Sequence, residues 1–296
     1  MKKGVQLVLA TAVISGVSIF LNKFGVSGMS PSLFVTAKNL LVGLFLFSFL
    51  LLLGQWNHLR SLNKAQWSKL ALIGLIGGSV PFLLFFTGLS MTSAAQGALI
   101  HKTLFVWVAL LATFFLREKI SRNMLIGGAL LIIGNLVILR VVGFSLGIGD
   151  LLILLATLFW AGEITLSKHL LKDVSGTIVA FGRMGFGSAY LLLYLVFTGG
   201  LSGFASLNSG AWLWILLTSV FLLGYVWTFY NGLATIPAST ATAILLVGTV
   251  ITTVLNLLWT GDIFPHTIIG SLFLVSGILF YLDVPWRNSK ERTMAS

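Results

Sequence analysis

The chain has 296 residues, of which 57% are hydrophobic and only 8% are charged, and its mean hydropathy is +1.04. Soluble proteins carry roughly 25% charged residues, so these few charges do not suffice to cover the surface of a soluble globule of this size. The composition excludes a soluble enzyme and, despite a formal net charge of +11, a soluble nucleic-acid-binding protein. It predicts an all-α membrane protein whose partner is the lipid bilayer.

Ten apolar stretches are long enough to span a membrane, because about 20 residues of helix cross roughly 30 Å of hydrocarbon. The first resembles a secretory signal at its start but stays apolar as far as Leu21, so we expect a membrane helix there and no cleaved leader. The connections are short and rich in Gly, Ser, Asn and Pro, which predicts no soluble domain. The predicted spans are 4–23, 31–53, 68–90, 93–115, 123–141, 150–171, 177–199, 211–234, 237–259 and 266–284.

Basic residues gather in the connections on one side of the predicted bundle. If the amino terminus is cytoplasmic, the outside segments hold only Lys23 and Arg140. The positive-inside rule therefore places both termini in the cytoplasm. The inside segments then hold Lys2, Lys3, Arg60, Lys64, Lys69, Arg117, Lys119, Arg122, Lys168, Lys172, Arg287, Lys290 and Arg292.

Rare residues recur at a nearly constant spacing, which indicates an internal duplication. Because each half holds five helices, an odd number, the second half enters the membrane in the opposite orientation. We predict a first five-helix repeat at 1–145, a second, inverted repeat at 146–286 and a cytoplasmic tail at 287–296. Inverted repeats are typical of transporters that rock around a site near the midplane. The matched pairs are Lys23 with Lys168 and Lys38 with Arg183, each 145 apart, Glu118 with Asp262, 144 apart, and Gly127 with Gly270 and Gly134 with Gly277, each 143 apart.

Several short motifs, taken in order along both halves, resemble those of the drug/metabolite transporter superfamily, in particular its EamA-type members. The motifs are the Lys38/Arg183 pair, Trp160-Ala161-Gly162, Phe115-Leu116-Arg117-Glu118-Lys119 and the paired glycines of the fifth and tenth spans. The resemblance implies a secondary transporter that exports or exchanges a small-molecule substrate, often an amino acid, across a bacterial inner membrane.

Five ionisable side chains lie inside the predicted helices: Lys38, His101, Lys102, Glu163 and Arg183. A charge in the bilayer costs at least a few kcal/mol and is normally kept where it faces a cavity or a partner. Glu163 and Arg183 lie at a similar depth, about 10–12 Å from the same side at 1.5 Å per residue. Glu163 can hold a substrate ammonium or a proton, and Arg183 can bind a carboxylate through its planar fork. Alternatively, the two neutralise each other and pin two helices together.

The other three ionisable residues also allow two interpretations each. Lys38 either faces the cavity or extends its charge to the membrane surface. His101 and Lys102 are adjacent on a helix, so at most one of them faces a cavity squarely. His101 either serves proton coupling or is a hydrogen-bonded structural residue. Lys168, like Lys23, is predicted to be an anchor at the membrane interface.

Uncharged residues add further candidates. Trp160, Tyr225, Tyr230 and Asn231 can contact substrate, or they can serve only packing. Pro81 lacks the N–H that its helix needs, so it predicts a kink that acts as a gate or is simply tolerated. The glycines of the fifth and tenth spans serve either dimerisation or packing within the chain.

Enzyme functions are disfavoured. Gly147 to Asp150 has the GxGD pattern of intramembrane aspartyl proteases, but no second intramembrane Asp accompanies it. Ser202, in a GxSG pattern, has no His nearby in the sequence. There is no metal-ligand spacing and no phosphate-binding loop, so we expect no enzyme, no cofactor and, at most, coupling to protons or other ions. A flippase for lipid-linked substrates and a passive channel remain as alternative functions.

Overall fold

The structure, a computed structural model, describes residues 2–25, 30–140, 146–261 and 264–294, and the side chains of 23–25 and 283–294 lie outside the description. The regular elements of the described chain are all helices, and ten of its stretches are long and apolar enough to cross a membrane. This confirms the predicted all-α fold with ten spans. Seven spans are single helices: α1 (Lys2–Gly25), α2 (Pro31–Leu52), α8 (Arg122–Leu139), α9 (Ile148–Leu170), α10 (Gly176–Phe197), α11 (Ser209–Leu233) and α14 (Pro265–Met294).

The other three spans are each broken into two helices. The breaks fall at Ser79, Thr103 and the pair Leu245 and Leu246. Two short helices, α3 (Trp56–Arg60) and η1 (Gly200–Phe204), lie in connections. The broken spans are α4 (Lys64–Gly78) with α5 (Val80–Leu89), α6 (Ala94–Lys102) with α7 (Leu104–Leu116), and α12 (Ala238–Ile244) with α13 (Val247–Thr260).

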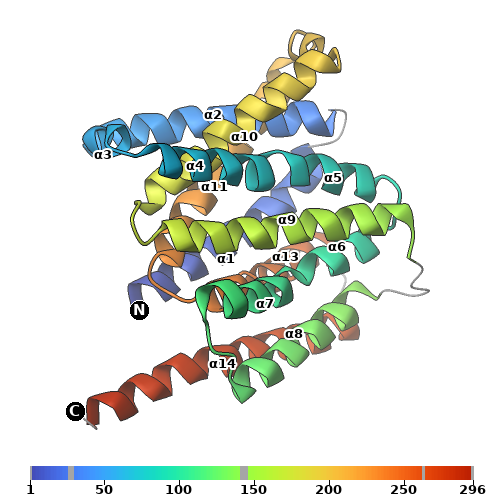
Figure 1. The fold of residues 1–296 in the computed structure, drawn as a ribbon. Coiled ribbons are helices and arrows are strands. Elements are labelled where there is room, and N and C mark those ends of the chain that lie inside the picture. The colour runs from blue at the N-terminus through green and yellow to red at the C-terminus, as the bar shows by residue number, and fades with distance from the viewer. Residues whose placement is uncertain (1, 26–29, 141–145, 262–263, 295–296) are drawn as a thin grey trace.

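The helices form a bundle with a pair of spans at each edge. Helices α2 and α10 pack together at one edge, and α8 and α14 pack together at the other (Figure 1). Between them, α9 contacts α4, α5, α6 and α7, while α1 contacts α11 and α13. The chain begins on the side of the bundle that also carries α3, and we call this side the N-terminal face (Figure 1).

A polar residue directly precedes many of the helices. Its side chain can accept a hydrogen bond from a backbone N–H of the first turn, which has no partner within the helix. Each of these side chains accepts a hydrogen bond from the backbone N–H three residues later. The residues are Asn63 before α4, Ser93 before α6, Ser121 before α8, Ser175 before α10 and Asn208 before α11.

Helices α8 and α14 cross at their backbones through four glycines. A Cβ atom on Gly127 would lie 2.7 Å from the carbonyl oxygen of Gly277, and a Cβ on Gly277 would lie 2.8 Å from that of Gly127. Gly134 and Gly270 form the same reciprocal contact at 2.8 Å in both directions. These glycines therefore pack two helices of one chain against each other, which is one of the two roles that the sequence left open.

A matched pair of substitutions tests this crossing. Gly127→Ala should lower the free energy of unfolding by about 1–3 kcal/mol, because the added methyl group meets a backbone carbonyl that cannot move alone. Gly128→Ala, one residue along the same helix, should be neutral or slightly stabilising, since its nearest neighbour would be Phe105 at an ordinary 3.5 Å. Unfolding in mixed detergent micelles would measure both, and equal effects would show that the crossing is not tight.

Candidate functional site

Two opposite charges meet inside the bundle. Glu163 lies on α9 with 1% of its surface exposed, and Arg183 lies on α10 with 8% exposed. The Nε atom of Arg183 is 3.8 Å from Oε2 of Glu163, and this Nε has no hydrogen-bond partner in the described part of the chain. The structure thus brings together the two residues whose depth matched in the sequence, in an ion pair that is long for a buried one.

The second oxygen of the Glu163 carboxylate is held by two hydroxyl groups. Ser167 Oγ donates to Oε1 at 2.6 Å from one turn along α9, and the Tyr230 hydroxyl donates to the same atom at 2.7 Å from α11. Tyr230 is therefore a member of the buried cluster, a contact that the sequence did not predict, and its contact with substrate stays a prediction. Ser167 was missed, although its spacing of four residues from Glu163 on a helix was a usable signal.

The broken third span supplies a backbone acceptor to the same cluster. Pro81 has no N–H, so the Gly77 carbonyl four residues earlier loses its helical hydrogen bond. That carbonyl accepts instead from Arg183 Nη2 at 3.1 Å and from the indole Nε1 of Trp160 at 3.0 Å. Ser79, with φ −137° and ψ −74°, leaves the helical conformation at this point. The kink predicted at Pro81 is present, and its open carbonyl is bound by side chains of α9 and α10.

The backbone at the break fits closely against the charged pair. A Cβ atom on Gly77 would lie 2.9 Å from Cδ of Glu163 and 3.1 Å from Nε of Arg183. The next carbonyl, that of Gly78, accepts from Nδ2 of Asn39 on α2 at 3.1 Å. Sequence reasoning missed Gly77 and Asn39; counting back four residues from the proline would have identified the Gly77 carbonyl.

Aromatic rings surround Trp160 on the other side of the carbonyl. The ring centroid of Trp160 is 4.9 Å from that of His101, 5.3 Å from that of Phe82 and 5.7 Å from that of Phe85. Nδ1 of His101 is buried and has no hydrogen-bond partner among the described residues. His101 lies two residues before the break at Thr103, so it joins the α6–α7 break to the ring cluster.

Lys38 and Lys102 lie apart from this cluster. Among the described residues, no hydrogen bond or ion pair joins either of them to it. Lys38 Nζ lies 5.3 Å from the ring centroid of Phe34, one turn earlier on α2. Lys102 is the last residue of α6 and is half-buried. Both lysines remain candidates for a positive charge that acts on the substrate over a longer distance.

Tyr225 and Asn231 make contacts within α11. The ring of Tyr225 stacks on that of Phe229 at 5.8 Å with an interplanar angle of 15°. Asn231 Nδ2 donates to the Trp227 carbonyl at 2.8 Å, one turn earlier in the helix. These two contacts are local, and they differ from the contact that joins Tyr230 to another helix.

Lys168 makes hydrogen bonds that the sequence did not predict. Its Nζ donates to the carbonyls of Leu233 at 2.7 Å and Ala234 at 3.3 Å, which closes the carboxyl end of α11. The residue is half-buried and serves as a helix cap, while its predicted place at the membrane interface stays a prediction. Lys23, its predicted counterpart, has a side chain outside the described residues.

Two carboxylates also cap helices near the bundle ends. Glu118 accepts from the N–H groups of Ala238 at 2.6 Å and Ser239 at 3.1 Å at the start of α12. Asp150, in the GxGD pattern, accepts from Gly147 N–H and from the Thr92 hydroxyl. These contacts give both residues structural roles, while Asp262 lies outside the described residues. Within the described chain, no group of three or more His, Cys, Asp or Glu side chains is placed to hold a metal ion.

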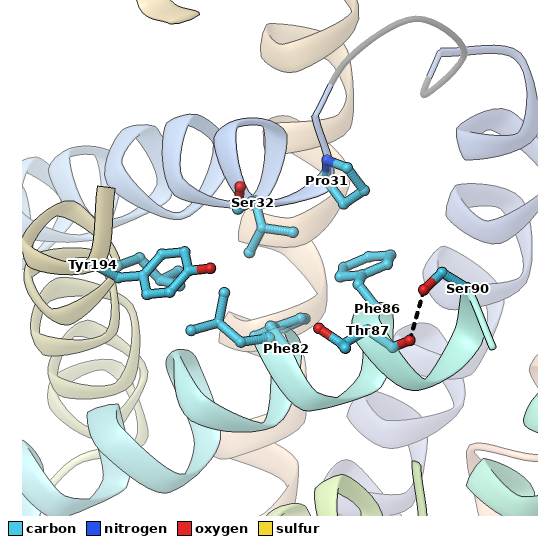
Figure 2. A pocket seen from close by; sticks show the side chains of 10 residues that line it. Pro31, Ser32, Phe82, Phe86, Thr87, Ser90 and Tyr194 are labelled. Carbon is cyan, nitrogen blue, oxygen red and sulfur yellow. Dashed lines mark hydrogen bonds between the residues drawn. The ribbon is translucent and has the colours of Figure 1, made fainter. Parts of the chain in front are cut away.

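A cavity of about 300 Å³ opens at the face opposite the N-terminal face, between α2, α5 and α10. Figure 2 shows rings and hydroxyl groups converging on it, with Pro31 and Ser32 at the start of α2 and Tyr194 on α10. The ring of Phe82 separates this cavity from Trp160, against which it packs edge to face. The wall that α5 and its end contribute consists of Phe82, Leu83, Phe86, Thr87 and Ser90.

A second cavity, of about 470 Å³, lies near the N-terminal face beside α3. Its walls include Phe47, Trp67, Phe181 and Phe186, together with the charged residue Arg60. A lipid flippase is expected to have a polar groove that opens sideways, so these largely apolar walls do not favour that alternative function.

Comparisons with known proteins agree on a transporter family. A model of the EamA-like transporter family matches residues 2–140 and 147–282. The uncharacterized transporter YyaM of Bacillus subtilis is 25% identical over 299 residues, which cover 97% of each chain. An uncharacterized transporter of Methanothermobacter thermautotrophicus is 24% identical over 65% of this chain and 61% of its own.

Two further similarities cover a shorter segment and the fold alone. Protein LicB of Haemophilus influenzae is 28% identical over 130 residues, which are 43% of this chain and 44% of that protein. A protein of known crystal structure superposes with a TM-score of 0.76 over 96% of this chain and 98% of its own. Its sequence identity is 15%, so this likeness shows a common fold.

Proposed function

Because the chain belongs to the EamA-like transporter family, we propose that this multi-pass membrane protein moves an amino acid or a related small metabolite by alternating access, with export as the favoured direction. The observation that carries the proposal is the buried pair of Glu163 and Arg183. The free energy needed to remove two charges from water exceeds the electrostatic free energy gained by a contact as long as 3.8 Å. Stability alone therefore explains the buried pair poorly.

An amino acid complements this pair group by group. Its ammonium can replace Arg183 beside Glu163, and its carboxylate can replace Glu163 beside Arg183, so the exchange leaves no charge unpaired. Tyr230 and Ser167 hold the Glu163 carboxylate in place during the exchange. The rings of Trp160, Phe82 and Phe85 offer an apolar surface to a substrate side chain.

Proton coupling is the second part of the proposal. A proton taken up by Glu163 removes the negative charge that faces Arg183, and this weakens the ion pair and lets the site open. His101 packs against Trp160, beside the same cluster. An imposed pH gradient would then change the rate of transport, and replacing Glu163 by Gln would abolish the dependence.

We further propose that 1–145 and 146–286 are inverted repeats, that 287–296 is a tail, and that both termini are cytoplasmic at a bacterial inner membrane. Equivalent glycine contacts support the repeats. A Cβ on Gly88 would lie 2.5 Å from the Gly149 carbonyl oxygen between α5 and α9, and a Cβ on Gly232 would lie 3.1 Å from that of Gly4 between α11 and α1. Gly149 follows Gly4 by 145 positions and Gly232 follows Gly88 by 144, which are the spacings of the charged pairs.

Flux in proteoliposomes tests the proposal. Purified protein is reconstituted, and uptake and exchange of a panel of radiolabelled amino acids are measured with and without a pH gradient. We expect saturable flux that substrate on the far side accelerates, and that falls at least 100-fold in the double variant Glu163→Gln with Arg183→Met. A loss of 100-fold corresponds to about 2.7 kcal/mol at 1.36 kcal/mol per tenfold change.

The control liposomes carry a variant with a change far from the pair, Gly128→Ala, which should transport normally. Flux that does not saturate would identify a channel. Sealed liposomes with folded protein and no flux over the whole panel would overturn the amino-acid proposal and bring lipid-linked or other metabolite substrates forward.

A further inference from the structure

We propose that the Gly77 carbonyl is a second acceptor on Arg183 which the carboxylate of the substrate displaces, and that its release frees α5 to move and open the cavity between α2, α5 and α10. This inference rests on the proposed function, since it assumes that Arg183 receives a substrate carboxylate. Under this proposal, Gly77, Pro81 and Trp160 are positioning residues. They couple the binding of substrate at the site to the position of α5.

The geometry of Arg183 means that a substrate carboxylate displaces both partners of its guanidinium together. Nε and Nη2 are neighbouring donors on one edge of the planar guanidinium, the edge that a carboxylate binds with two parallel hydrogen bonds. In the structure, Nε faces Glu163 and Nη2 donates to the Gly77 carbonyl. A carboxylate seated on this edge therefore displaces both partners together, and only the hydrogen bond from Trp160 still holds the carbonyl.

The Gly77 carbonyl matters because it is one of two carbonyls at the break that side chains hold in the described chain, the other being that of Gly78, which accepts from Asn39. In an unbroken helix the N–H four residues later would hold the Gly77 carbonyl, but that residue is Pro81. Ser79 already has a non-helical backbone, so α5 can pivot there without breaking a further turn. The bonds from Arg183 and Trp160 to Gly77 thus replace the missing helical bond and fix the angle between α4 and α5.

The element released is one wall of the cavity. Phe82 and Phe86 of α5 lie across it from Ser32 of α2 and Tyr194 of α10 (Figure 2). Val35 of α2 lines the same cavity. Phe82 also packs against Trp160, the second donor to the carbonyl. A pivot of α5 at Ser79 consequently changes the cavity width and the contact with Trp160 in a single movement.

The absence of cysteine from the chain allows a test that needs no substrate. Val35, 6% exposed and on the cavity wall, is replaced by Cys as the single thiol. The rate of its reaction with N-ethylmaleimide is then measured in lipid nanodiscs. Releasing the carbonyl with the double variant Glu163→Gln and Arg183→Met, which leaves no unpaired charge, should raise the rate about tenfold. Trp160→Phe, which keeps the ring and removes one donor, should raise it about threefold.

Restoring the helical bond should reverse the effect. Pro81→Ala added to the double variant gives the Gly77 carbonyl an N–H partner, so the rate should return to within twofold of that of Val35→Cys alone. Pro265→Ala is the matched control: it replaces a proline at the first position of α14, where no helical bond is missing, and should not restore the rate. An exposed thiol from Ser206→Cys, in the connection after η1 and outside the lining of the cavity, should react equally in all variants.

Each outcome of the labelling experiment either supports or overturns the inference. An unchanged rate in both the double variant and Trp160→Phe, or a raised rate that Pro81→Ala leaves raised, would overturn the inference. If the double variant does not yield folded protein, Trp160→Phe with and without Pro81→Ala gives the same comparison. Because labelling needs no substrate, missing amino-acid flux would refute the proposed function alone, whereas normal flux with unaltered labelling would refute the coupling alone.

Discussion

Replacing Arg183 with Met alone should lower the free energy of unfolding by about 3–5 kcal/mol, because it leaves the Glu163 carboxylate buried without its counter-charge. Only the hydroxyls of Ser167 and Tyr230 would remain beside the carboxylate. Adding Glu163→Gln should recover most of the loss, since the pair is then replaced by neutral groups of similar volume. Unfolding of the purified variants in mixed micelles, followed by intrinsic fluorescence, measures the difference.

The double variant also separates stability from transport. It should be folded nearly as well as the natural protein and yet carry almost no flux, because neither charged group of a substrate finds a partner. A single variant as stable as the double one would mean that Glu163 is already neutral in the folded protein or reaches water, and the ion pair would then lose its importance.

Gly77→Ala should be the methyl addition in the third span that disturbs the charged pair directly. The new Cβ would meet Cδ of Glu163 at 2.9 Å and Nε of Arg183 at 3.1 Å, so either the ion pair or the α4–α5 break has to shift. We expect a loss of about 1–3 kcal/mol in stability, typical of overpacking, and a flux reduced by at least tenfold. The same unfolding and flux measurements apply.

Gly162→Ala is the matched control for this substitution. Gly162 precedes Glu163 on α9, but no atom lies within 4 Å of the position that its Cβ would take. Its replacement should leave both stability and flux unchanged or slightly raise stability, because alanine is the better helix former. If Gly77→Ala were equally silent, the site would have to be looser than the structure has it.

The spans and the charged pair were open to prediction for the same physical reason. Lipid requires every backbone group to be satisfied inside a helix, so length and composition suffice to locate ten spans. The cost of a charge in the bilayer likewise singles out five ionisable residues, and the similar depth of Glu163 and Arg183 allows these two to pair. The inverted arrangement of the halves stays a prediction that the glycine contacts support.

The remaining members of the cluster depend on packing between distant helices, which no local pattern reveals. Tyr230 contacts Glu163 from 67 positions away, and Trp160 contacts the Gly77 carbonyl from 83 positions away. The neighbouring tyrosine, Tyr225, had the same claim in the sequence and lies within electrostatic reach of both charges, but the hydrogen bond to Glu163 comes from Tyr230. Counting back from Pro81 identifies the Gly77 carbonyl as an open acceptor, but it does not identify the side chains that bind it.

The cap that Lys168 places on α11 has a mechanical consequence. Helices α9 and α11 are joined at two levels, by Tyr230 to Glu163 and, about one turn further toward the N-terminal face, by Lys168 to the carbonyls of Leu233 and Ala234. Two contacts at different heights resist both sliding and rotation of these two helix halves against each other. A movement that parted α9 from α11 would have to break both contacts.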